Sequence, residues 1–146
     1  MLTAVGYHRW AGRVLVSIGL VVGVTGVFMG LAIPIAGWIE RGYISFFGAL
    51  FLVALVKGFV HIRAGREALH REWMIRAFAI GLAVATQRVI FIPALFAVAD
   101  PTEGPVATLS AVSFLAAFAV HVSVAEAWIR LTRRSGVLVA RAAKAA

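Results

Sequence analysis

Apolar residues fill four long runs of the chain, and polar residues gather in the short segments between them. A helix that crosses a bilayer needs about 20 mostly apolar residues, and every run reaches that length. Short connections place consecutive helices beside each other in opposite directions, and no run alternates like a strand of an outer-membrane barrel. The pattern therefore predicts an all-α, integral membrane four-helix bundle with up-down-up-down topology. It predicts a single transmembrane domain over residues 1–146, with spans at about 14–39, 43–62, 74–99 and 105–130 and a cytoplasmic tail at 131–146.

The composition agrees with this assignment. Hydrophobic residues make up 62% of the chain and charged residues 14%, whereas a soluble domain has about 45–50% and about 25%. The mean hydropathy of +0.98 is far too high for a soluble core of this length. The chain contains no cysteine, which excludes disulfides, thiolate catalysis, iron–sulfur clusters and thiolate ligation of zinc or haem.

Basic residues are distributed unevenly between the two sides of the predicted spans. The opposite side from the termini carries Arg41 and an acidic connection. Lys and Arg mark the cytoplasmic face of a membrane protein, so both termini are predicted to lie in the cytoplasm. Nucleic-acid binding is not expected from the net charge of +8, because the charges sit at helix ends rather than along a surface stripe. The side that holds both termini carries ten basic residues: Arg9, Arg13, Arg63, Arg66, Arg71, Arg130, Arg133, Arg134, Arg141 and Lys144.

Glycines recur along one face of the first predicted span. They include two small-xxx-small pairs, the arrangement that lets helix backbones approach closely in lipid. The face is predicted to pack either against the second or fourth span of this chain or against a helix of another membrane protein. The glycines of this helix-packing face are Gly12, Gly19, Gly23, Gly26, Gly30 and Gly37.

Arg88 lies 14 residues into the third predicted span. At 1.5 Å per residue it is about 21 Å from the start of the span, near the middle of the membrane. A charge at that depth is costly and is a functional hypothesis by default. His121 in the fourth span lies within reach, so Arg88 and His121 are predicted to form an intramembrane polar hub. The alternatives are that Arg88 binds an anionic group of a cofactor or lipid, or that it lines a transport pathway.

Four histidines raise the question of a bound haem. A b-type haem is held by two imidazoles at similar depth on facing helices. His61 and His121 differ in depth by about 4–5 Å of helix rise, so they form one candidate pair, and His8 and His70 form the other. Haem b is therefore the one cofactor that the sequence suggests. Each histidine is also explained as an interfacial or hydrogen-bonded polar residue, and no other metal site is expected.

No arrangement of catalytic residues is recognisable. The chain lacks a His-Glu-x-x-His motif, a phosphate-binding glycine loop, a Gly-x-Ser-x-Gly elbow and paired carboxylates. Glu126 is the acidic residue at a span edge, and its i, i+4 spacing predicts a salt bridge with Arg130. No catalytic residue is predicted, and an enzyme of this composition would have to work through a bound cofactor.

Three short motifs carry a resemblance to a known family. They lie at 8–13 (His-Arg-Trp-Ala-Gly-Arg), at 70–76 (His-Arg-Glu-Trp-Met-Ile-Arg) and at 126–128 (Glu-Ala-Trp), and Arg88 follows the second. With these motifs the chain resembles a family of small bacterial four-helix membrane proteins of unknown function. The His-x-x-Trp-Met-x-Arg element is the most specific part, and the resemblance extends over most of the chain.

The resemblance implies a location in the cell and a set of residues shared with the family, but it implies no activity. It implies a helical bundle in the bacterial inner (cytoplasmic) membrane, with His8, His70, Arg76 and Arg88 in the shared pattern. His61 and His121 are not among the fixed features of that pattern. The basic and imidazole residues at the starts of the first and third spans are predicted to form one cytoplasmic polar cluster. Its members are His8, Arg13, His70 and Arg76.

These observations favour a non-catalytic accessory or scaffold subunit packed against a larger membrane complex. The chain has almost no extramembrane mass and offers a glycine face to neighbouring helices. Respiratory and photosynthetic complexes are the expected hosts, with the lipid bilayer and other membrane-protein helices as partners. The alternatives are a haem-binding electron-transfer protein and a small transporter or lipid-binding protein.

Overall fold

The protein consists of four long helices. The computed structural model describes residues 4–33, 37–98 and 102–145. All four helices are long and apolar enough to cross a membrane, which confirms the prediction of an all-α chain with four candidate spans. The helices are α1 (Ala4–Ala32), α2 (Gly37–Arg63), α3 (Glu67–Ala97) and α4 (Glu103–Ala145).

The helices extend beyond the predicted spans at several ends, and the break between α1 and α2 lies earlier than predicted. The first span was expected over 14–39, but α1 ends at Ala32 and α2 already begins at Gly37, whose φ is +66°. Pro34 explains the early end, since proline has no backbone N–H and disfavours a helical residue before it. Residues 34–36 lie outside the described part of the chain, and apolarity alone gives no sign of such a break. Gly37 consequently belongs to a different helix from the other glycines of the predicted packing face.

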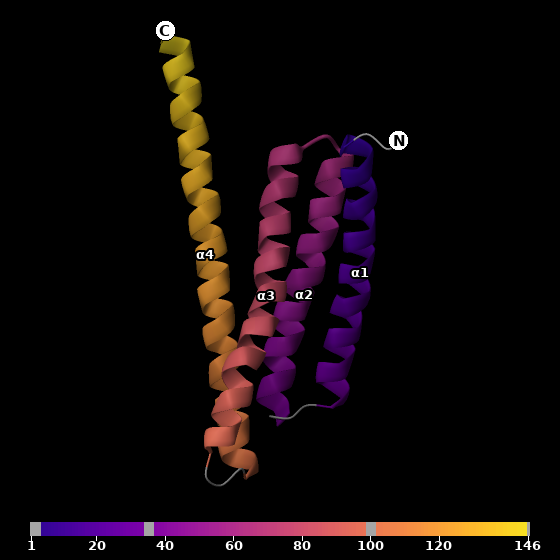
Figure 1. The fold of residues 1–146 in the computed structure, drawn as a ribbon, viewed down its shortest axis with the longest axis vertical. Helices are drawn as coiled ribbons and strands as arrows, with labels where there is room; N and C mark the ends of the chain where they lie inside the picture. The colour runs from indigo at the N-terminus through magenta and orange to yellow at the C-terminus, as the bar shows by residue number, and fades with distance from the viewer. Residues whose placement is uncertain (1–3, 34–36, 99–101, 146) are drawn as a thin grey trace.

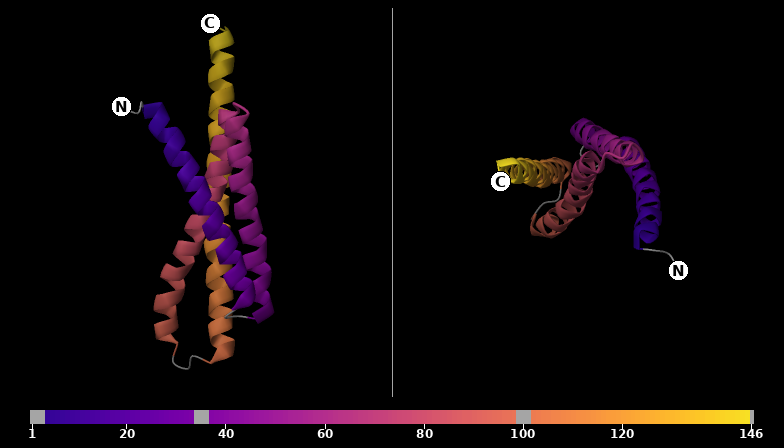
Figure 2. Two further views of the ribbon diagram at one scale, coloured as in Figure 1. Left: turned by 90° about the vertical axis from the view of Figure 1, so that its right-hand side faces the viewer. Right: turned by 90° about the horizontal axis from the view of Figure 1, so that it is seen from above.

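The second difference concerns the C-terminal segment. Residues 131–146 were expected to form a tail beyond the fourth span, but α4 continues as one helix to Ala145. No proline interrupts this segment, and its alanine, leucine and arginine residues are good helix formers. In Figures 1 and 2 the last part of α4 therefore extends beyond the other three helices.

The helices form an open, curved row in chain order. Figure 2 shows this arc from its end, with α1 and α4 at the two extremes. α2 packs against α1 and α3, and α3 packs against α4, whereas α2 and α4 meet at only a few residues. Within the described residues α1 contacts neither α3 nor α4. The four-helix bundle is therefore not closed into a ring.

The interface between α1 and α2 is built on glycines. A Cβ atom added at Gly19 would lie 2.9 Å from Leu55, and one at Gly23 would lie 2.7 Å from Leu52. Gly30 is equally crowded by a side chain of α2, whereas nothing lies within 4 Å of such an atom at Gly12 or Gly26. The part of the glycine face that is filled in this chain is thus covered by the second helix.

Aromatic rings join α2 to α4. The ring centroids of Phe47 and Phe118 are 4.1 Å apart, and those of Tyr43 and Phe114 are 4.2 Å apart. The Tyr43 hydroxyl lies 3.4 Å from the hydroxyl of Ser110. This aromatic cluster accounts for the brief contact between the two helices. Beyond it, α2 and α4 are separated by α3.

Small residues bring α3 close to both neighbours. Ala77 packs with Ala54 and Leu55 of α2, and Ala83 packs with Ala117 of α4. Both alanines of α3 are almost fully buried. In lipid, helix association depends on such close packing rather than on a hydrophobic driving force. α3 is therefore the central helix on which α2 and α4 are arranged.

Candidate functional site

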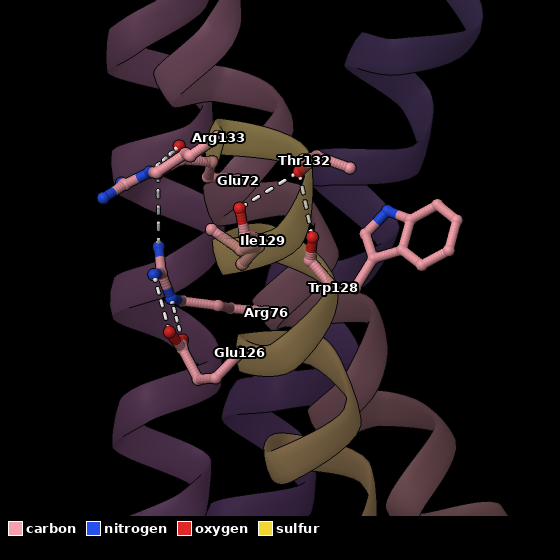
Figure 3. A network of polar contacts seen from close by, with 7 residues as sticks. All are labelled: Glu72, Arg76, Glu126, Trp128, Ile129, Thr132 and Arg133. Atoms are coloured by element: carbon pink, nitrogen blue, oxygen red, sulfur yellow. Dashed lines mark hydrogen bonds and ion pairs between the residues drawn. The ribbon is translucent and has the colours of Figure 1, made fainter. Parts of the chain in front are cut away.

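Four charged residues form an ion network between α3 and α4, which Figure 3 shows from close by. Arg76 binds Glu126 with two hydrogen bonds, from Nε to Oε1 at 2.5 Å and from Nη2 to Oε2 at 3.2 Å. Its Nη1 atom lies 4.0 Å from Glu72, one helical turn earlier. Bidentate arginine–carboxylate pairs are among the stronger polar contacts in proteins. The Arg76–Glu126 pair therefore fixes the relative position of the two helices at this level.

Arg133 completes the network. Its Nε donates to Glu72 Oε1 at 2.5 Å, and its Nη2 donates to Oε2 of the same carboxylate. The Arg133 side chain is 58% exposed, while that of Glu72 is only 13% exposed. Positive and negative charges thus alternate across the interface, and every acid of the network is bound by an arginine. Along the helix axes, the network lies toward the end of the molecule that holds the α2–α3 connection. We call this the network end.

Two cations lie against the ring of Trp73 at the network end. The Lys57 ammonium is 4.5 Å from the centroid of its ring, and the Arg76 guanidinium is 4.9 Å from it. Cations at such distances are attracted by the negative face of an indole ring. The two contacts gather one basic residue from α2 and one from α3 around a single aromatic side chain.

His70 ties the start of α3 to α2. Its Nδ1 atom lies 2.7 Å from the carbonyl oxygen of Gly58, and because a carbonyl only accepts, Nδ1 donates the hydrogen. A Cβ atom at Gly58 would lie 2.8 Å from the sulfur of Met74, so a larger residue here would have to displace the Met74 side chain. The contact orients the imidazole and fixes which ring nitrogen carries the proton.

An apolar groove adjoins the network. It has a volume of about 270 Å³ and runs between α2 and α4 over the surface of α3. Trp73, Arg76 and Glu126 stand at its polar end, and the rest of its lining is apolar. We call it the α2–α4 groove. Its apolar lining residues are Leu50, Ala54, Ala79, Ile80, Val122 and Ala125.

The structure places the two members of the predicted intramembrane hub in different surroundings. His121 Nδ1 lies 2.8 Å from the carbonyl of Ala117, and its Nε2 lies 3.3 Å from the hydroxyl of Thr86. Arg88 is exposed on α3. No hydrogen bond joins Arg88 to His121 among the described residues.

The structure separates the members of the predicted cytoplasmic cluster. His70 and Arg76 face α2 and α4 through the bonds described above, whereas His8 and Arg13 are exposed on α1. His61 is half-buried on α2. In the described parts of the chain no group of three or more His, Asp or Glu residues is placed to hold a metal ion.

The sequence did not reveal the acid–base pairing of the network. Glu126 was expected to pair with Arg130, but it binds Arg76 of the neighbouring helix instead. The expectation used only residues of the same helix, while the observed pair depends on which helices are neighbours. One signal was available: His70, Trp73 and Arg76 are spaced by three residues, which puts them on one helix face.

Comparison with known proteins yields one family. A family model described as "Predicted membrane protein (DUF2306)" matches residues 2–129. Neither the curated proteins nor the solved structures gave a match. The matched range includes all three motifs of the sequence resemblance, which is thereby confirmed. Four apolar helices and the family description agree on a multi-pass membrane protein. The chain therefore belongs to the DUF2306 family of predicted membrane proteins, a family of unknown function.

Proposed function

We propose that this protein is a non-catalytic accessory subunit that packs against a larger complex of the bacterial inner membrane. Its spans would cross the membrane alternately, with both termini in the cytoplasm. The distribution of basic residues supports this orientation, since the network end and the C-terminal part of α4 hold most of them. Respiratory and photosynthetic complexes are the hosts that we expect.

Arg88 is the observation that carries the proposal. It lies 12 residues after Arg76 and 9 before Ala97 on the same helix, about 18 Å and about 14 Å along the axis. This depth is near the middle of the bilayer, where an arginine costs about 2.5–3.5 kcal/mol or more. The side chain is exposed, and the described residues provide no ion-pair partner for it. A helix of another subunit with a carboxylate or free carbonyl would remove this cost.

The open row supports the same proposal. Only 17% of the most apolar window of α1 is buried within the chain, because this helix packs on α2 alone. Exposed apolar faces suit lipid tails and partner helices equally well, so they do not identify a partner by themselves. They do leave room for one beside α3, where Arg88 is exposed.

A photo-cross-linking experiment tests the proposal. Val84 and Ile92 are exposed one turn on either side of Arg88, and each is replaced with a photo-reactive phenylalanine analogue. Illumination of intact cells should give adducts with a different membrane protein at both positions. In the Arg88→Leu background these adducts should fall at least fivefold.

The control position is Phe28 on α1, which is 70% exposed. Its adducts should not change in the Arg88→Leu background. Adducts of twice the mass of the chain, or protein adducts that persist unchanged after Arg88→Leu, would contradict an accessory role centred on Arg88.

A haem-binding electron carrier is the second candidate, and one contact favours it. Histidines that bind a metal usually donate their other ring nitrogen to a carbonyl or carboxylate, as His70 Nδ1 does to Gly58. This favours His70 over His121 as a ligand, since both ring nitrogens of His121 already have contacts. For the pair His8 and His70, the haem would have to bridge α1 and α3, which make no contact among the described residues. Absorption spectra of the oxidised and dithionite-reduced protein decide the matter, because haem gives a Soret band that shifts on reduction.

A further inference from the structure

The α2–α4 groove exists because of small side chains and a divergence of two helices. Ala54 on α2, Ala79 on α3 and Ala125 on α4 line it, and each contributes only a methyl group. The aromatic cluster holds α2 and α4 together at one end, and α3 separates them beyond that point. The resulting space of about 270 Å³ exceeds the roughly 150 Å³ of an apolar cavity that binds benzene.

The groove extends along the helix axes toward the network end. Leu50 and Ala54 are followed on the same face of α2 by Lys57, and the distance from Leu50 to Lys57 along the axis is about 10 Å. On α3, the corresponding order is Ile80, Arg76 and Trp73. The shape is therefore that of a slot for a hydrocarbon chain, with a polar and aromatic end.

The polar end of the α2–α4 groove still has hydrogen-bond donors that could bind an anion. Lys57 is exposed and forms no ion pair among the described residues; its contact is with the Trp73 ring. Arg76 Nη1 lies 4.0 Å from Glu72, which is too far for a hydrogen bond. Glu72 and Glu126 each already bind an arginine. The unused donors thus belong to basic residues, and the carboxylates are neutralised.

We propose that the α2–α4 groove binds an anionic phospholipid. One acyl chain occupies the apolar slot, and the phosphate lies between Lys57 and Arg76 beside Trp73. Charge and shape together select this ligand. Lys57, which lies beside the groove without an ion pair among the described residues, attracts a negative headgroup, while Glu126 in the lining is already bound by Arg76. The apolar lining suits a hydrocarbon chain. Such binding is independent of the docking role proposed for Arg88, which lies more than two turns beyond the groove on α3.

The test uses the full-length protein, delipidated in detergent. Native mass spectrometry measures the binding of palmitoyl-oleoyl phosphatidylglycerol, of the corresponding phosphatidylcholine and of inorganic phosphate. Phosphatidylglycerol should bind at least tenfold more tightly than phosphatidylcholine. Lys57→Gln should weaken its binding about fivefold, the effect of one basic residue near a membrane surface, and Lys57→Arg should restore it.

Two matched controls separate this site from the general lipid contact of a membrane protein. Arg71→Gln removes a charge of an exposed residue at the same end, and its effect should stay within twofold. Leu50→Trp should fill the slot and weaken phosphatidylglycerol binding at least fivefold, whereas Leu82→Trp, which alters an exposed leucine outside the groove, should not. Equal binding of the two lipids, equal effects of Lys57→Gln and Arg71→Gln, or binding of phosphate as tight as that of the lipid would overturn the proposal.

Discussion

Helix α2 meets α1 on one face and α4 on another, and these two contacts are built in opposite ways. Toward α1, glycines of that helix leave room for side chains of α2, among them Leu52, Leu55 and Ile44. Toward α4, aromatic rings make a brief contact, after which the helices separate and leave a groove beside an ion network. Helix α2 thus combines a tightly packed contact with an open one, beside which an ion network joins α3 to α4. In lipid the first arrangement provides close packing, and the second leaves the α2–α4 groove open.

The largest effect should come from filling the tight interface. Gly23→Leu introduces four heavy atoms where even a Cβ atom would lie 2.7 Å from Leu52. We expect the free energy of unfolding to fall by about 3 kcal/mol, the upper part of the usual range for overpacking. Reversible unfolding in mixed micelles measures this value. Gly26→Leu is the control, because nothing lies within 4 Å of a Cβ atom there, and an equal loss at this site would show that the α1–α2 contact is not glycine-dependent.

A smaller effect is expected in the ion network that joins α3 to α4 beside the groove. Arg76→Leu leaves the carboxylate of Glu126 without its arginine, and the free energy of unfolding should fall by about 2 kcal/mol, less than for a fully buried pair. The double variant Arg76→Leu with Glu126→Leu should recover at least half of that loss, since no unpaired charge remains. A double-mutant cycle on the same unfolding assay gives the coupling. Purely additive losses would mean that the pair does not hold α3 to α4.

The smallest effect belongs to the outer part of the network. Arg133→Leu removes an arginine whose side chain is 58% exposed, and exposed ion pairs contribute little to stability because water surrounds both charges. Thermal unfolding in detergent should therefore change little, and the change should diminish further at high salt because salt screens exposed charges. A loss as large as that of Arg76→Leu would show that the network acts as one unit rather than as an inner and an outer pair.

The sequence was sufficient for the number and type of helices, because membrane spans are recorded in runs of apolar residues. It was less informative about boundaries: the run at 14–39 hides the end of α1, since the connecting residues are as apolar as the helix. The sequence did not show which helices pack against each other. A glycine face marks a close contact but not the helix that fills it, and the fourth span was one of two expected partners.

The candidate site shows the same division between local and long-range information. The spacing of His70, Trp73 and Arg76 on one helix face was visible in the sequence. The partners of these residues are Gly58, Lys57 and Glu126 on two other helices, and they depend on tertiary arrangement. A sequence without aligned relatives does not carry that information, so the nearest residue of opposite charge, Arg130, was expected in place of Arg76.

The length of α4 has a mechanical consequence. Its 43 residues measure about 64 Å, roughly twice the hydrocarbon thickness of a bilayer. The ion network holds this helix against α3 as far as Arg133. The 12 residues that follow to Ala145 extend about 18 Å beyond this attachment. A tilt of about 10° at the attachment would displace the end of the helix by about 3 Å. A spin label near the C-terminus would accordingly report small rotations of α4 that leave the groove itself almost unchanged.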